Sequence, residues 1–212
     1  MHKNSNTKSL VMIVVLLVSG MAGFLAYQQL NSHKQQHEFQ SLLVFPKEKS
    51  FSGFKLIDKN NNSLDINSFA GHWTLIFFGY THCPDVCPTT LSELQKTFKQ
   101  LDGQNLKQAP QVLFVSVDPQ RDTPHTLNEY IQFFNPKFNA ATADDANILS
   151  ITSQIGAAYH IESHEKDNIN YNVDHTAAVF LINPDKKLYG IFRSPHDSSK
   201  ISSDLTQLIG RS

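Results

Sequence analysis

Apolar and polar positions along the chain follow two patterns that alternate after residue 50. Continuous apolar runs at residues 74–79 (TLIFFG) and 112–117 (VLFVSV) are typical of strands that are buried on both faces. Between them, apolar residues recur at helical spacing over residues 91–101, which predicts a helix. Strands that are separated by helices pair in parallel at the centre of a sheet, so the pattern predicts an α/β fold.

The remaining elements are predicted from turn and capping residues. Asn60 and its neighbours separate two short strand-like runs and predict a hairpin at the start of the domain. Thr123 and Pro124 predict the N-cap and first residue of a further helix. The other expected elements are a helix after Asp144 or Asp145, a hairpin of strands 177–182 and 188–192, and a last helix that begins near Ser198 or Ser199. Together they predict a mixed sheet with helices on both faces.

The N-terminus carries an uncharged apolar segment at residues 10–27, close to the minimum length for a helix that crosses a bilayer. Lys3 and Lys8 precede it, so by the positive-inside rule the short tip stays in the cytoplasm and the rest is exported. The expectation is an uncleaved single-pass anchor in the inner (cytoplasmic) membrane, with a cleaved signal peptide as the alternative. The predicted organisation is tip and anchor over 1–27, a linker over 28–49 and one domain over 50–212.

The amino-acid composition excludes several classes of protein. The 212 residues include 18 Lys and Arg against 19 Asp and Glu, a net charge of −1, which excludes a nucleic-acid binder that relies on a basic surface. Two cysteines are too few for a disulfide-rich scaffold or for a four-cysteine zinc site.

The two cysteines lie together in GYTHCPDVCP (79–88), at the end of the first buried run. Loops at the carboxyl ends of strands hold the functional sites of α/β folds. Pro88 predicts that Cys87 caps the following helix, whose N-terminus lowers the pKa of nearby thiols, whereas Asp85 opposes this effect. The thiols could form a redox-active or structural disulfide, or bind one ion. A disulfide over so short a loop adds little stability, which disfavours a purely structural role.

A metal site would need a third ligand from elsewhere in the chain. Thiolates are soft ligands suited to Cu(I), and imidazole also suits Cu(II). The chain has 10 His, and spacing alone singles out none of them. His175 stands apart because it lies with Asp174 directly before the buried strand at 177–182.

Three segments of the chain are informative together: GYTHCPDVCP (79–88), SVDPQRDTP (116–124) and VDHTAAVFLINPD (173–185). In sequence and order they resemble the SCO/SenC family of copper-binding, thioredoxin-like proteins. The resemblance implies a thioredoxin-like fold and copper, as Cu(I) or Cu(II), bound by Cys83, Cys87 and His175. It also implies that Asp174 supports the histidine ligand, and that residues 118–122 border the site or cap a helix.

The family resemblance implies a membrane-anchored metallochaperone that supports assembly of the CuA site of cytochrome c oxidase. The expected partners are the oxidase subunit that carries CuA, other periplasmic copper carriers or thiol–disulfide proteins, and the membrane, with no nucleic acid. The alternative is a thiol–disulfide oxidoreductase that uses Cys83 and Cys87 to keep exported cysteines reduced. A peroxidase would need Arg121 close to Cys83, and structural zinc would need a fourth ligand.

Overall fold

The structure is a computed structural model that describes residues 5–32, 39–104, 106–165 and 168–210. The chain divides into two units, Met1–Glu38 and Phe39–Ser212. The first contains helix α1 (Ser5–Ser32). Over the part of the chain that is described, no helix has the length and apolar character needed to cross a membrane.

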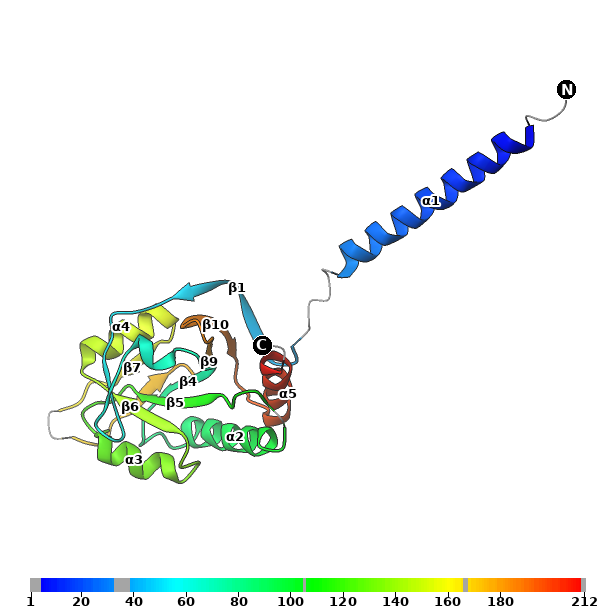
Figure 1. Ribbon diagram of the computed structural model, residues 1–212. Coiled ribbons are helices and arrows are strands. Elements are labelled where there is room, and N and C mark those ends of the chain that lie inside the picture. The colour runs from blue at the N-terminus through cyan, green and yellow to red at the C-terminus, as the bar shows by residue number, and fades with distance from the viewer. Residues whose placement is uncertain (1–4, 33–38, 105, 166–167, 211–212) are drawn as a thin grey trace. The chain divides into compact units, whose positions relative to one another are not determined.

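The second unit is built on an eight-stranded mixed sheet with the strand order β1-β10-β9-β4-β5-β6-β2-β3 (Figure 1). Strands β4, β5 and β6 are parallel, whereas β9 pairs with β4 in the antiparallel sense. The bounds are β1 Leu42–Ser50, β2 Leu56–Asp58, β3 Ser63–Leu64, β4 Thr74–Gly79, β5 Gln111–Ser116, β6 Asn139–Thr142, β9 Val179–Ile182 and β10 Lys187–Phe192. A separate two-stranded sheet pairs β7 (Tyr159–Ile161) with β8 (Val173–His175). The expected mixed sheet and N-terminal hairpin are confirmed.

Strand β4 is buried along its whole length because it separates two apolar cores. Leu75 and Phe77 face one core, and Ile76 and Phe78 face the other, as the alternation of side chains along a strand requires. The register pairs Gly79 with Ser116, so β4 and β5 end at the same edge of the sheet. The loops that follow both strands therefore begin side by side.

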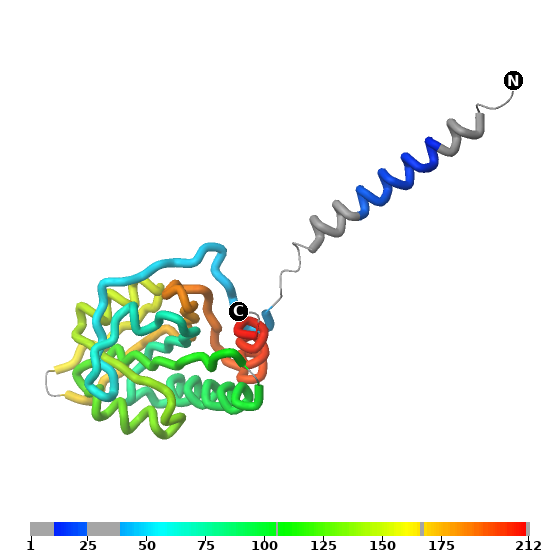
Figure 2. The backbone as a smooth tube through the Cα atoms, in the orientation of Figure 1, coloured from blue at the N-terminus to red at the C-terminus, as the bar shows by residue number. Residues whose placement is uncertain are grey.

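Helices cover both faces of the sheet. Apolar residues of α2 (Val86–Leu101), α3 (Pro124–Gln132) and α5 (Ser198–Ile209) fill one core. Those of α4 (Asp145–Ile155) and the 3-10 helix η1 (Ile66–Phe69) fill the other. Helices α2 and α5 lie side by side (Figure 2).

The predicted caps are largely confirmed. Thr123 caps α3 by accepting a hydrogen bond from the backbone of Thr126, with Pro124 at the first helical position. Asp144 caps α4 in the same way. The last helix begins at Ser198 as predicted, and the Asp197 side chain caps it by accepting hydrogen bonds from the backbone N–H groups of Ser199 and Lys200.

Strand β1 corrects the prediction that residues 28–49 form a linker. Residues 42–50 instead pair with β10 at the sheet edge. The side chain of Asp204 on α5 holds the start of this strand, accepting hydrogen bonds from the backbone N–H groups of Gln40, Ser41 and Leu42. The apolar residues of β1 are confined to its first four positions, 42–45, and the polar PKEKS sequence that follows gave no strand pattern. Residues 33–38 of the predicted linker lie outside the described residues.

Candidate metal centre

The two cysteines lie on the loop from β4 to α2 and in the first turn of that helix. Cys87 is fully buried, Cys83 is half-buried, and both are free thiols. The backbone N–H of Cys87 donates a hydrogen bond to Sγ of Cys83 over 3.4 Å. Both thiols therefore lie at the N-terminal end of α2, where free N–H groups stabilise a thiolate.

The helix begins two residues earlier than predicted. Asp85, not Cys87, occupies the N-cap position, and its carboxylate makes no capping hydrogen bond. Pro88 is tolerated as the third helical residue, because the first N–H groups of a helix have no intrahelical partner for proline to remove. The consequence is that Cys87 is fixed by helical geometry and points into the core.

His175, at the end of β8, completes the group. Its Nε2 lies 3.3 Å from Sγ of Cys87 and 3.8 Å from Sγ of Cys83. Its Nδ1 lies 3.3 Å from the carbonyl oxygen of Thr176. A carbonyl oxygen only accepts, so Nδ1 carries a proton and donates it to Thr176, which leaves Nε2 facing the two thiols.

Aromatic rings fix the orientation of this imidazole. Phe77 on β4 meets the His175 ring edge-on, with 5.8 Å between the ring centres, and Tyr80 does so at 5.9 Å. The three ligand atoms of Cys83, Cys87 and His175 all lie within 4.8 Å of one another. The three predicted metal ligands are thus brought together by the fold, although 88 residues separate Cys87 from His175.

The thiols differ in proton affinity. A hydrogen bond from Cys87, together with one from His175, lowers the pKa of Cys83 to about 3 against the opposing effect of burial. The same thiol contact and burial raise the pKa of Cys87. The pair therefore holds one thiolate at neutral pH, on the more exposed sulfur.

Solvent reaches the group at the half-buried Cys83, and a groove of about 330 Å³ borders His175. Its lining includes His175, Thr176 and the exposed residues His160 and Asp174. Two soft sulfur donors and one nitrogen donor match the ligand preferences of copper. A site with three protein ligands and an open side suits an ion that is exchanged rather than a structural ion.

Comparison with known proteins agrees with this geometry. The model of the SCO1/SenC family matches residues 46–210. The chain belongs to the SCO1/SenC family.

An SCO2-like protein of Rickettsia prowazekii is 33% identical over 182 residues, which cover 86% of this chain and 87% of that protein. The copper-bound structure of ScoI from Bradyrhizobium japonicum is 32% identical, with a TM-score of 0.65, and the match covers 74% of this chain and 99% of that one. BsSco, described as a member of the Sco family of cytochrome c oxidase assembly proteins, is 18% identical with a TM-score of 0.61 and supports the fold alone; the match covers 80% of this chain and 99% of that one.

Within this SCO1/SenC chain, the surroundings of Asp174 differ from the sequence-based expectation. Asp174 is exposed, and over the described residues its carboxylate makes no hydrogen bond to His175. The Thr176 carbonyl accepts from the imidazole instead, and a backbone acceptor leaves no mark in the sequence. Arg121, which the peroxidase alternative required near Cys83, forms its hydrogen bonds with Asp118 and with the 169–171 segment.

Gly79 is a site residue that the sequence reasoning missed. A Cβ atom at this position would lie 2.5 Å from Sγ of Cys87 and 2.9 Å from Cε2 of Phe114. The missing side chain lets Cys87 pack directly against the end of β4. The signal available in the sequence was a glycine that ends an otherwise apolar strand run.

Proposed function

We propose that this chain is a copper metallochaperone that binds one copper ion through Cys83, Cys87 and His175. The observation that carries the proposal is the convergence of these three donor atoms within 4.8 Å of one another. Thiolates and imidazole together suit both Cu(I) and Cu(II). The copper-bound relatives of the same family add support.

The ligands have separate tasks in taking up the ion. Cys83 is half-exposed and already a thiolate at neutral pH, so it is the first donor that an arriving ion meets. Cys87 must lose its proton on binding, and its buried place on α2 fixes where the second sulfur lies. The oriented Nε2 of His175 supplies the third donor. Two thiolates and a neutral imidazole give a neutral group with Cu(II) and a singly negative one with Cu(I).

Copper titration of the full-length protein, purified in detergent with reduced thiols, tests this proposal. We expect one copper per chain for both oxidation states. His175→Ala should weaken Cu(II) binding more than Cu(I) binding, because the two thiolates remain. His125→Ala is the matched control, since that side chain is 80% exposed and lies on α3. Equal loss of both oxidation states in His175→Ala would contradict the ligand assignment.

We propose, from the family resemblance of the sequence motifs, that the recipient is the oxidase subunit that carries the CuA site. A three-ligand site with an open side permits stepwise ligand exchange with an acceptor's thiols. Incubation of the copper-loaded chain with a metal-free CuA domain should produce the CuA absorption spectrum. A spectrum that forms equally fast with free copper alone would argue against a delivery role.

The alternative function is thiol–disulfide exchange, and the lowered pKa of Cys83 is the observation that favours it. The Cys83 thiolate would attack a partner disulfide, and Cys87 would then displace the partner's thiol and leave a Cys83–Cys87 disulfide. This activity should survive in His175→Ala and disappear in either Cys→Ser variant. Loss in His175→Ala as well would tie the thiol chemistry to the metal site.

We further propose, from the sequence, that the folded unit lies on the exported side of the inner membrane. The support is the uncharged segment at residues 10–27 behind Lys3 and Lys8. Carbonate extraction of membranes from expressing cells, followed by protease treatment of intact spheroplasts, tests both parts. A chain that is washed off the membrane, or protected from protease, would contradict the proposal.

A further inference from the structure

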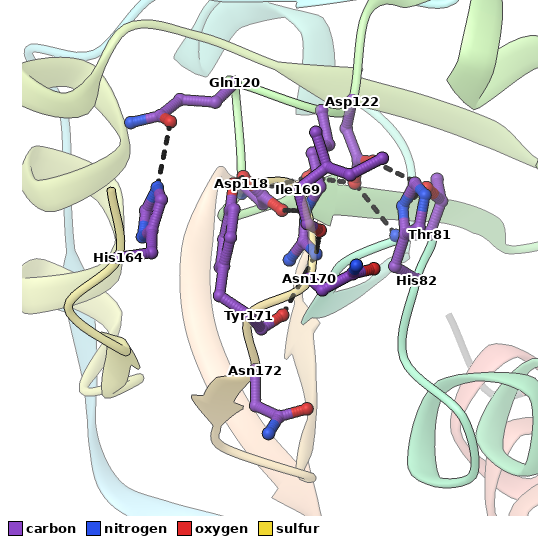
Figure 3. A network of polar contacts seen from close by, with 12 residues as sticks. Thr81, His82, Asp118, Gln120, Asp122, His164, Ile169, Asn170, Tyr171 and Asn172 are labelled. Atoms are coloured by element: carbon purple, nitrogen blue, oxygen red, sulfur yellow. Dashed lines mark hydrogen bonds and ion pairs between the residues drawn. The ribbon is translucent and has the colours of Figure 1, made fainter. Parts of the chain in front are cut away.

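A buried polar network lies in the turn between β5 and α3, at residues 118–122 (Figure 3). Both carboxylates of this turn, Asp118 and Asp122, are fully buried. Helix capping does not account for them, since Thr123 supplies the cap of α3. Their hydrogen bonds lead instead to the two segments that carry the proposed metal ligands.

Asp122 contacts the cysteine segment. Its carboxylate accepts hydrogen bonds from the backbone N–H of Thr81 over 2.9 Å and from the Thr81 hydroxyl over 2.6 Å. It also accepts from the Ser116 hydroxyl, which anchors it to β5. Thr81 lies two residues before Cys83, so these bonds fix the loop from which the first thiol projects. Burial keeps water from competing for them.

Arg121 contacts the histidine segment. Its side chain is 7% exposed and forms an ion pair with Asp118. One terminal nitrogen, Nη1, donates to the carbonyl oxygens of Ile169 over 2.9 Å and Tyr171 over 3.0 Å. The guanidinium carbon lies 3.6 Å from the centre of the Tyr171 ring, and the Tyr171 hydroxyl donates to Asp118 over 2.7 Å. Tyr171 lies two residues before β8, which ends in His175.

A third contact joins Arg121 to the site itself. The guanidinium carbon lies 5.3 Å from the centre of the Tyr80 ring, and Tyr80 meets the His175 ring edge-on. Arg121 and Asp122 are consecutive residues, so the chain itself fixes the spacing between their contacts. We propose that residues 118–122 form a clamp that sets the separation between the two thiols and the imidazole. Asp122 is the positioning residue for Cys83, and Arg121 is the positioning residue for His175.

The proposal predicts that mutation of Arg121 and mutation of Asp122 have separate effects, the first on the histidine segment and the second on the cysteine segment. Without the Arg121 guanidinium, the segment at 169–175 loses two hydrogen bonds and its stacking contact, while both cysteines keep their contacts. This inference rests on the proposed copper site, where Cu(II) depends on the imidazole more than Cu(I) does. We expect Arg121→Gln to weaken Cu(II) binding by about 10–100-fold, as for other residues that orient metal ligands, and to leave Cu(I) binding within about threefold.

Hydrogen exchange of the metal-free, full-length protein tests the clamp without copper. Arg121→Gln should speed exchange over residues 169–175 and leave residues 81–87 unchanged. Asp122→Ala should show the opposite pattern. Arg193→Gln and Asp185→Asn are the matched controls, because both side chains are exposed. Unchanged exchange over 169–175 in a folded Arg121→Gln would overturn the proposal, as would equal loss of Cu(I) and Cu(II).

Loss of the buried guanidinium leaves Asp118 without its cation, so a milder variant is needed as well. Tyr171→Phe removes only the hydroxyl bond to Asp118 and should show the same effects as Arg121→Gln, to a smaller extent. If Arg121→Gln does not fold, this variant decides: unchanged exchange over 169–175 would overturn the clamp. A wild-type protein that binds no copper would refute the proposed function, while the exchange patterns would still test the clamp.

Discussion

Replacing Gly79 by alanine tests the packing of the metal centre against the sheet. The added Cβ would lie 2.5 Å from Sγ of Cys87, a distance that real Cβ atoms essentially never show. The added Cβ would also lie 2.9 Å from Cε2 of the Phe114 ring. Neither neighbour has a flexible end, since Cys87 is held by α2 and Phe114 is a buried ring between two elements. The Cys87 thiol must therefore move away from β4.

Overpacking of a close-packed core costs about 1–3 kcal/mol, and this contact lies at the upper end because both neighbours are rigid. We expect Gly79→Ala to lower the free energy of unfolding by about 2–3 kcal/mol in urea denaturation of the full-length protein. The displaced sulfur should also weaken binding of both copper oxidation states, in contrast to the selective loss expected for His175→Ala.

Gly103→Ala is the matched control, because a Cβ at that position meets nothing within 4 Å and its backbone has no positive φ. Its free energy of unfolding should change by less than about 0.5 kcal/mol. The reasoning is refuted if Gly79→Ala unfolds at the same urea concentration as the wild type and binds copper equally well. Cys87 would then not be packed against the end of β4.

Three further outcomes follow from buried or titrating groups. Since the pKa of Cys83 is lowered to about 3, its alkylation by iodoacetamide should be independent of pH between about 5 and 8, with buried Cys87 protected; a rate that rises with pH in mass spectrometry would argue against a thiolate. Asp204→Ala should lower the free energy of unfolding in urea by about 3 kcal/mol, because it leaves several N–H groups at the start of β1 without partners; a change as small as that of exposed Asp185→Ala would contradict this. Burial lowers the pKa of His196 in the folded protein. The stability that its neutral form contributes is therefore present above about pH 6.5 and is lost as the pH falls towards the pKa of the folded state. In His196→Gln the melting temperature should depend less on pH below about 6.5 than in the wild type, and an equal dependence would contradict this.

The sequence predicted the structure best where a residue pattern has a single physical explanation. The apolar run at β4 predicted its bounds correctly, because only a strand between two cores is apolar at every position. Thr123 with Pro124 located the start of α3 for a similar reason. Strands β6, β7 and β8 were missed because each has only three or four residues, too few for a period to show, and no recognisable turn marks them as β2 and β3 are marked.

The sequence predicted the two cysteine ligands more directly than the histidine ligand. Cys83 and Cys87 are near neighbours in the chain, so their proximity could be expected from the sequence alone. His175 reaches them only through the pairing of strands and the packing of aromatic rings, and without the family resemblance nothing in its spacing singled it out. The contacts of Arg121 and Asp122 are likewise tertiary, and their residue types alone were equally consistent with a turn that caps a helix.

X-ray absorption spectroscopy at the copper edge tests the central claim most directly. The full-length protein, loaded with Cu(II) and then reduced to Cu(I), should show two sulfur scatterers in both states and a histidine nitrogen scatterer with Cu(II). The histidine signal should disappear in His175→Ala and persist in His125→Ala. A spectrum with only nitrogen and oxygen scatterers, or one that is unchanged in His175→Ala, would contradict a copper site formed by Cys83, Cys87 and His175.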